Sequence, residues 1–256
     1  MKAVILAGGF GTRLSEHTGL IPKPMVEIGG KPIIWHIMKI YNHYGIKDFV
    51  ICCGYKQYVI KEYFANYFYH NSDITVDLSD NSVEVLDNHS EDWKVTMVDT
   101  GLNTLTGGRI KRIQKYIGNE RFLLTYGDGV GDVDIQATIE AHEKAGKLLT
   151  MTTFQPSGKL GVVEIADDGA VKDFLEKPQN GGSWINAGFF VCEPGVFDVL
   201  EGDHEMFERQ PMQRLLEKGE INAYKHIGFW KPMDTLRDCQ ELNAMWDKGN
   251  APWFNF

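Results

Sequence analysis

A glycine-rich segment directly after the first apolar run could bind an anion. It covers Ala7–Leu14 and reads AGGFGTRL. Glycines between a strand and a helix let the backbone approach a phosphate closely, with several N–H groups pointing at it. Arg13 adds a forked cation that suits phosphate oxygens. Neither a third glycine three residues after Gly11 nor a Gly-Lys-Ser/Thr sequence follows. The loop is therefore neither a dinucleotide fingerprint nor a Walker A loop. A tight turn without a ligand is the alternative.

A single lysine between two prolines follows this loop. Pro22 and Pro24 restrict the backbone on both sides of Lys23. A surface lysine is usually only solvated. A lysine held this stiffly, so soon after a glycine-rich loop, is more typical of a phosphate ligand.

Two aspartates far apart in the chain could hold a cation. Asp128 follows an apolar run and lies between two glycines, where a turn is the bland alternative. Asp234 precedes a helix expected to begin near Thr235, so it could instead cap that helix. Ligands of open α/β sheets bind beyond the carboxyl ends of the strands, and Mg²⁺ takes few protein carboxylates together with phosphate oxygens. If both aspartates hold one ion, they must lie close in space.

Three further segments carry weaker local signals. Glu176-Lys177-Pro178 and the later Asn186-Ala187-Gly188 have side chains that could bind an anion and hydroxyl groups. Thr104–Arg109 combines hydroxyls, glycines and an arginine near an expected helix start. Its side chains could serve a nucleotide or merely cap the helix, and local sequence does not decide between these.

Alternating apolar strands and helices must position these residues. Strands are expected at 2–6, 48–53, 122–126, 148–154, 161–165, 171–175 and 185–192, and helices at 32–44, 58–68, 107–117, 135–145, 211–218 and 235–246. Residues 71–100 read as a hairpin-like excursion, and Asp167–Gly169 as a hairpin turn. No linker or internal repeat divides residues 1–256. The pattern predicts a single α/β domain with a mixed, mostly parallel central sheet, helices on both faces and a small inserted β region.

Composition excludes several classes of protein. A formal net charge of −9 over 256 residues disfavours nucleic acid as a partner. No apolar stretch approaches the roughly 20 residues that span a bilayer, and the apolar start is too short for a signal peptide. None of the four cysteines has a C-x-x-C spacing. We therefore expect a cytoplasmic protein that does not associate with membranes.

The segment LAGGFGTRL, followed by PKPMVEIGGKPI, resembles the sugar-nucleotide pyrophosphorylase family. That resemblance implies a Rossmann-like nucleotidyltransferase fold. It also implies a nucleotide site that includes Leu6, Ala7, Gly8, Gly9, Phe10, Gly11, Thr12, Arg13, Lys23, Thr104, Arg109 and Asp128. Arg13 and Lys23 would contact phosphates.

The same resemblance assigns the remaining candidates. Asp128 and Asp234 would bind Mg²⁺, while Glu176, Lys177, Asn186 and Gly188 would bind the sugar phosphate. Arg13, Lys23, Lys177 and the two aspartates would carry catalysis. The sugar phosphate is already anionic, so the catalytic task is to position two polyanions and neutralise their charge.

Over nearly its whole length the chain resembles the branch of this family that makes CDP-glucose from CTP and glucose 1-phosphate. The similarity runs through KPMVEIGGKPIIWHIMK, CCGYK, YGDGV, NAGFFV and FWKPMDTLRD. It implies a role in dideoxysugar synthesis for O-antigen, and a homo-oligomer, a hexamer being expected. A thymidylyl- or uridylyltransferase, a non-catalytic homologue and a nicotinamide-dependent oxidoreductase are the alternatives. Leu20-Ile21 and residues 80–92 depart mildly from the pattern without touching its motifs.

Overall fold

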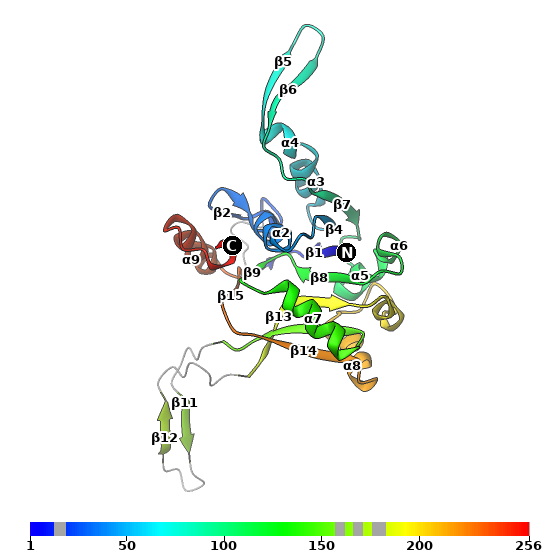
Figure 1. The fold of residues 1–256 in the computed structure, drawn as a ribbon, viewed down its shortest axis with the longest axis vertical. Coiled ribbons are helices and arrows are strands. Elements are labelled where there is room, and N and C mark those ends of the chain that lie inside the picture. The colour runs from blue at the N-terminus through cyan, green and yellow to red at the C-terminus, as the bar shows by residue number, and fades with distance from the viewer. Residues whose placement is uncertain (13–18, 157–161, 166–170, 176–182, 256) are drawn as a thin grey trace.

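A seven-stranded sheet forms the centre of the molecule (Figure 1). The structure, a computed structural model, describes residues 1–12, 19–156, 162–165, 171–175 and 183–255. The strand order is β14-β10-β13-β8-β1-β4-β7. β13 runs antiparallel to both of its neighbours and all other neighbouring pairs are parallel, so the expected mixed, mostly parallel sheet is confirmed. The strands are β1 (Lys2–Ala7), β4 (Asp48–Cys53), β7 (Lys94–Asp99), β8 (Phe122–Tyr126), β10 (Leu149–Phe154), β13 (Ile185–Cys192) and β14 (Ile221–His226).

Helices cover both faces of this sheet and enclose two apolar cores. Successive side chains of a strand point to opposite faces, so Ile5 enters one core and Leu6 the other. Cys52 and Cys53 are divided in the same way, as expected, and both are buried. The first core includes residues of α2 (Ile33–His43), α3 (Gln57–Ala65), α7 (Ile135–Ala145) and α9 (Leu236–Asp247). The second includes residues of α5 (Thr106–Arg112), α6 (Gln114–Ile117), η3 (Pro194–Val199) and α8 (Gln210–Glu217).

The segment at 71–100 only partly matches the expected excursion. β5 (Ser72–Asp77) and β6 (Ser82–Asn88) form an antiparallel hairpin that projects from the body, next to α4 (Tyr67–His70) (Figure 1). The end of the segment instead forms β7, the edge strand of the central sheet, because its apolar side chains pack beside β4.

A second hairpin pairs β11 (Val162–Ile165) with β12 (Val171–Leu175), as expected. The turn expected at Asp167–Gly169 lies outside the described residues.

Two expected helices are interrupted. α3 and α4 meet at Asn66, and α5 and α6 meet at Ile113. In the described part of the chain, no helix combines the length and apolarity that crossing a bilayer requires.

His36 on α2 is a buried, neutral side chain that contacts Trp253 near the C-terminus. Its Nε2 donates to the Ile28 carbonyl at 2.8 Å, and its Nδ1 accepts from Trp253 Nε1 at 3.3 Å. The Trp253 side chain belongs to η4 (Pro252–Phe254). A proton added at Nδ1 would face the N–H of Trp253. Burial lowers the pKa of His36 to about 4.

This buried histidine is expected to make the protein less stable in mild acid. An unfolded histidine titrates near pH 6.5, so as pH falls the unfolded chain takes up the proton first. The stabilisation is complete above pH 6.5 and is lost as pH falls toward 4. Between pH 7 and pH 5, the free energy of unfolding should drop by about 2 kcal/mol from this residue. Urea unfolding of wild type and His36→Asn at pH 7 and pH 5 measures this drop in the free energy of unfolding. An equally steep decline in the variant would contradict this assignment.

Candidate active site

The glycine-rich loop begins where β1 ends, at the carboxyl edge of the sheet. The Gly8 carbonyl accepts from Tyr55 N at 3.1 Å and from Arg109 Nη2 at 2.9 Å. A Cβ at Gly8 would lie only 2.2 Å from Arg109 Nη1. The loop therefore needs a glycine here because a buried guanidinium passes directly beneath its backbone.

The Lys23 ammonium lies between the two aspartates identified in the sequence. Its Nζ is 2.7 Å from Asp128 Oδ2 and 2.6 Å from Asp234 Oδ1. These contacts join residues 105 and 211 positions apart in the chain. The Lys23 side chain comes from η2 (Lys23–Met25), a short helix that follows Pro22 and contains Pro24. The juxtaposition that a shared cation site requires is present.

Pairing of two short strands brings the aspartates together. β9 (Gly129–Gly131) pairs antiparallel with β15 (Trp230–Pro232), with Gly129 opposite Pro232. Just beyond this pair, Met233 N donates to the Asp128 carbonyl at 2.7 Å. Asp234 does not cap the following helix. Thr235 is the N-cap of α9, in a capping box with Asp238. The capping alternative for Asp234 is therefore wrong.

The charges at this point favour a further cation, because two carboxylates face a single ammonium group. Burial by itself lowers the pKa of Lys23, but the nearby carboxylates of Asp128 and Asp234 outweigh it, and the pKa is raised. Lys23 is consequently charged at neutral pH. Two converging carboxylates fit Mg²⁺, which takes few protein ligands and completes its shell with waters and phosphate oxygens. No group of three or more acidic, histidine or cysteine side chains could hold a metal among the described residues. Such an ion would therefore depend on substrate oxygens.

A cavity of about 830 Å³ opens over the loop, the lysine and the aspartates. Its volume lies in the range of small-molecule sites, roughly 300–1,000 Å³. The predicted residues that line it are Leu6, Ala7, Gly8, Gly9, Phe10, Gly11, Thr12, Lys23, Thr104, Arg109, Asp128, Asn186 and Asp234. Gly188 does not line it. Arg13, Glu176 and Lys177 lie outside the described residues.

Arg109 holds the floor of this cavity together. Only 4% of the residue is exposed. Its guanidinium donates to the Gly8, Cys53, Gly101 and Leu102 carbonyls and to Thr100 Oγ1, at distances of 2.7–3.2 Å. These bonds tie the glycine-rich loop to the loops after β4 and β7. They identify Arg109 as a positioning residue. A direct contact with a nucleotide stays a prediction, as it does for Thr104, whose side chain is also buried.

Three of the residues that line the cavity were not among the predicted site residues. They are Tyr126, Glu208 and Arg209. Tyr126 donates to Glu208 Oε1 at 2.6 Å, and burial raises the pKa of the tyrosine, so its hydroxyl keeps the proton it donates. Gly188 lies against this tyrosine with φ of +77°, and a Cβ there would be 2.4 Å from the ring. Tyr126 directly precedes Gly127-Asp128, which is the signal that could have found it. Glu208 has no such marker.

The fold and the site together match one class of enzyme. The sequence profile of the nucleotidyl transferase family matches residues 2–247, so the chain belongs to the nucleotidyl transferase family. Enzymes of this family generally use a divalent metal ion. The chain is 56% identical to the glucose-1-phosphate cytidylyltransferase of Salmonella typhi, over 99% of this chain and 98% of the relative. It is 46% identical to the probable glucose-1-phosphate cytidylyltransferase of Bacillus subtilis, over 99% of both.

Solved structures share this fold. HddC from Yersinia pseudotuberculosis, complexed with GMP-PN, superposes with a TM-score of 0.68 at 25% identity, covering 96% of this chain and 99% of the other. A UDP-glucose pyrophosphorylase complexed with UDP-glucose gives 0.69 at 19% identity, over 97% and 98%. The second comparison supports the fold alone.

Proposed function

We propose that this protein transfers the cytidylyl group of CTP to α-D-glucose 1-phosphate and releases pyrophosphate. The observation that carries the chemistry is the Lys23 ammonium held between Asp128 and Asp234 beside the glycine-rich loop. The high identity to two relatives named as glucose-1-phosphate cytidylyltransferases supports CTP and glucose 1-phosphate as the substrates. The CDP-glucose so formed would serve dideoxysugar synthesis for O-antigen.

The reaction requires no activated hydroxyl. A phosphate oxygen of the sugar phosphate attacks the α-phosphorus of CTP. One P–O bond forms there while the bond to the β-phosphate breaks, and pyrophosphate leaves with the electron pair. The glycine-rich loop and Lys23 would hold the triphosphate, with Arg13 and Lys177 predicted to add positive charge. Mg²⁺ bound by Asp128 and Asp234 would supply neutralisation of phosphate charge.

Within this scheme, the preformed lysine–aspartate contact has two uses. It holds a cation at the place where phosphate charge will gather, so little rearrangement is needed when substrate binds. Its positive charge also offsets the repulsion between the two carboxylates.

We also infer that the enzyme acts in the cytoplasm as a homo-oligomer, a hexamer being expected. All four cysteines are buried and unpaired, as is usual in a reducing compartment. The β5–β6 hairpin places Ile74, Val76, Val83 and Val85 on one exposed face. A two-stranded hairpin is marginal by itself, so a second copy covering this face would stabilise it. Light scattering at micromolar concentration measures the number of copies.

Pyrophosphate release tests the proposed reaction. The enzyme is mixed with glucose 1-phosphate, Mg²⁺ and each of CTP, UTP, dTTP, ATP and GTP in turn. Release with CTP should exceed release with any other nucleotide by at least about tenfold in kcat/KM, a difference of about 1.4 kcal/mol. Preference for UTP or dTTP would establish the alternative uridylyl- or thymidylyltransferase. No release with any nucleotide would overturn the proposed function, and omission of Mg²⁺ provides the metal control.

A further inference from the structure

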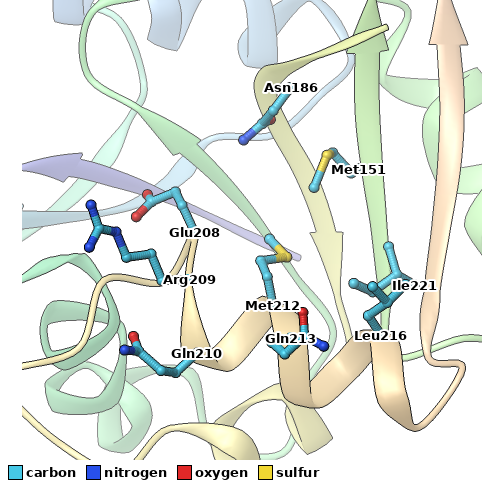
Figure 2. Close-up of a pocket in the computed structure, with 9 residues that line it drawn as sticks. All are labelled: Met151, Asn186, Glu208, Arg209, Gln210, Met212, Gln213, Leu216 and Ile221. Carbon is cyan, nitrogen blue, oxygen red and sulfur yellow. The ribbon is translucent and has the colours of Figure 1, made fainter.

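A second cavity, of about 560 Å³, adjoins the cavity over the glycine-rich loop. Asn186, Glu208 and Arg209 line both, so they mark the junction. The second cavity lies between α8 and the strands β10, β13 and β14, and Figure 2 shows its lining side chains. Asn186 and Glu208 lie to one side of Met151 and Met212, and Leu216 and Ile221 lie to the other (Figure 2). The cavity therefore has charged and polar side chains where it meets the first cavity, and the apolar side chains of Met151, Met212, Leu216 and Ile221 lie farther inside.

The Glu208 carboxylate at this junction is fixed in orientation. Tyr126 donates to its Oε1 at 2.6 Å, and Thr106 Oγ1 donates to its Oε2 at 2.7 Å. Thr106 is itself held, because its oxygen accepts from Phe207 N at 2.8 Å. A carboxylate has about four acceptor positions, and these two bonds use only two. The residue is exposed to the cavities, so the remaining positions are open to a ligand.

The Glu208 carboxylate at the junction favours a hydroxyl group over a phosphate as its ligand, whereas the neighbouring Arg209 side chain suits an anion. A carboxylate repels a phosphate but accepts a strong, charge-assisted hydrogen bond from a hydroxyl. Asn186 at the junction and Gln213 farther inside the second cavity add amide groups that both donate and accept. The methionine side chains can pack against the C–H groups of a sugar ring. These features match the ring of the second substrate rather than the triphosphate.

We propose that Glu208 is a specificity-determining residue that accepts a hydrogen bond from one ring hydroxyl of the sugar 1-phosphate, with the second cavity receiving the part of the ring remote from the phosphate. Tyr126 and Thr106 are the positioning residues that aim this carboxylate. This inference rests on the proposed function, since it assigns a role in choosing the sugar for that reaction.

Deoxygenated substrates test the role of Glu208. With CTP saturating, kcat/KM is measured for glucose 1-phosphate and its 2-, 3-, 4- and 6-deoxy analogues, in wild type, Glu208→Gln and Glu208→Ala. Wild type should reject one analogue by about 10–100-fold, the range of a hydrogen bond to a charged group. Each variant should lose a similar factor with glucose 1-phosphate but little with that one analogue. The KM for CTP should stay within about twofold.

The control is Glu140→Gln, which removes the same charge from an exposed residue of α7. Glu140 accepts one side-chain hydrogen bond and lines neither cavity. It should leave all five kcat/KM values unchanged. Equal losses on every substrate would show a merely structural role and overturn the proposal, as would wild-type values in both Glu208 variants. Absence of pyrophosphate release from wild type with any sugar phosphate would instead remove the proposed function itself, and this assignment with it.

Discussion

Asp128→Asn and Asp234→Asn are each expected to lower kcat by about 10²–10³-fold, the usual effect of losing one electrostatic contact to a reacting group. Each asparagine keeps the size of the side chain and can still accept from Lys23, so the fold should persist. Each lacks the negative charge that would bind Mg²⁺ and hold the lysine ammonium. Pyrophosphate release at saturating CTP and glucose 1-phosphate measures kcat.

Asp92→Asn is the matched control for these variants. Asp92 is exposed and pairs only with Lys47, at 2.6 Å, among the described residues. A surface pair of this kind contributes about 0–1 kcal/mol, so turnover should not change. Raising the Mg²⁺ concentration should restore part of the activity of the site variants if metal affinity is what they lose. Near-wild-type turnover in either variant would exclude that aspartate from catalysis, and a lowered melting temperature would point to a structural cause.

Arg109→Met is expected to have the largest effect on stability together with a large effect on nucleotide binding. The buried guanidinium makes five hydrogen bonds within the protein. Some of its acceptors have other donors, because the Gly8 carbonyl also accepts from Tyr55 N, and the Cys53 carbonyl also accepts from Thr100 N. The free energy of unfolding should therefore fall by about 2–4 kcal/mol rather than by the sum of five bonds. Without the guanidinium beneath it, the glycine-rich loop should bind CTP more weakly, raising KM by at least about tenfold.

Two further variants separate positioning from direct contact. Arg112→Met removes an exposed arginine of the same helix that pairs with Asp203, and it should cost less than about 1 kcal/mol. Arg109→Lys keeps the charge but cannot donate in the forked geometry that spans three loops. Urea unfolding and the KM for CTP are measured for all three. A normal free energy of unfolding combined with a large KM increase in Arg109→Met would mean that the guanidinium contacts the nucleotide rather than the loop.

Local pattern was sufficient for most of the architecture. Apolar runs of five or six residues, each followed by glycine or a polar turn, predicted β1, β4 and β8. The helical spacing of isoleucines predicted α2. The apolar runs and this spacing depend only on residues close together in the sequence, so both can be recognised without the tertiary structure. The boundaries within 58–68 and 107–117 were less accurate. Tertiary packing breaks each helix at a residue, Asn66 or Ile113, that nothing in the local pattern marks.

The edge strand β7 shows where local pattern was insufficient. Residues 94–99 alternate apolar and polar side chains much as β5 and β6 do, so the sequence groups all three into one excursion. Only the pairing partner separates them. β7 packs beside β4 in the central sheet, whereas β5 and β6 pair with each other. Sequence period indicates that a strand forms, but not which strand it joins.

The sequence by itself determined which residues are available for the chemistry. It placed the glycine-rich loop after the first strand, Lys23 between prolines, and Asp128 beyond an apolar run, because each is a local feature. The tertiary structure decided what these residues contact. The pairing of β9 with β15 places Asp234 beside Asp128. The order of strands in the sheet places Arg109 beneath Gly8. Tyr126 donates a hydrogen bond to Glu208, although the two residues are 82 positions apart in the sequence. Such contacts depend on strand register and on the path of distant loops, which no pattern of neighbouring residues contains.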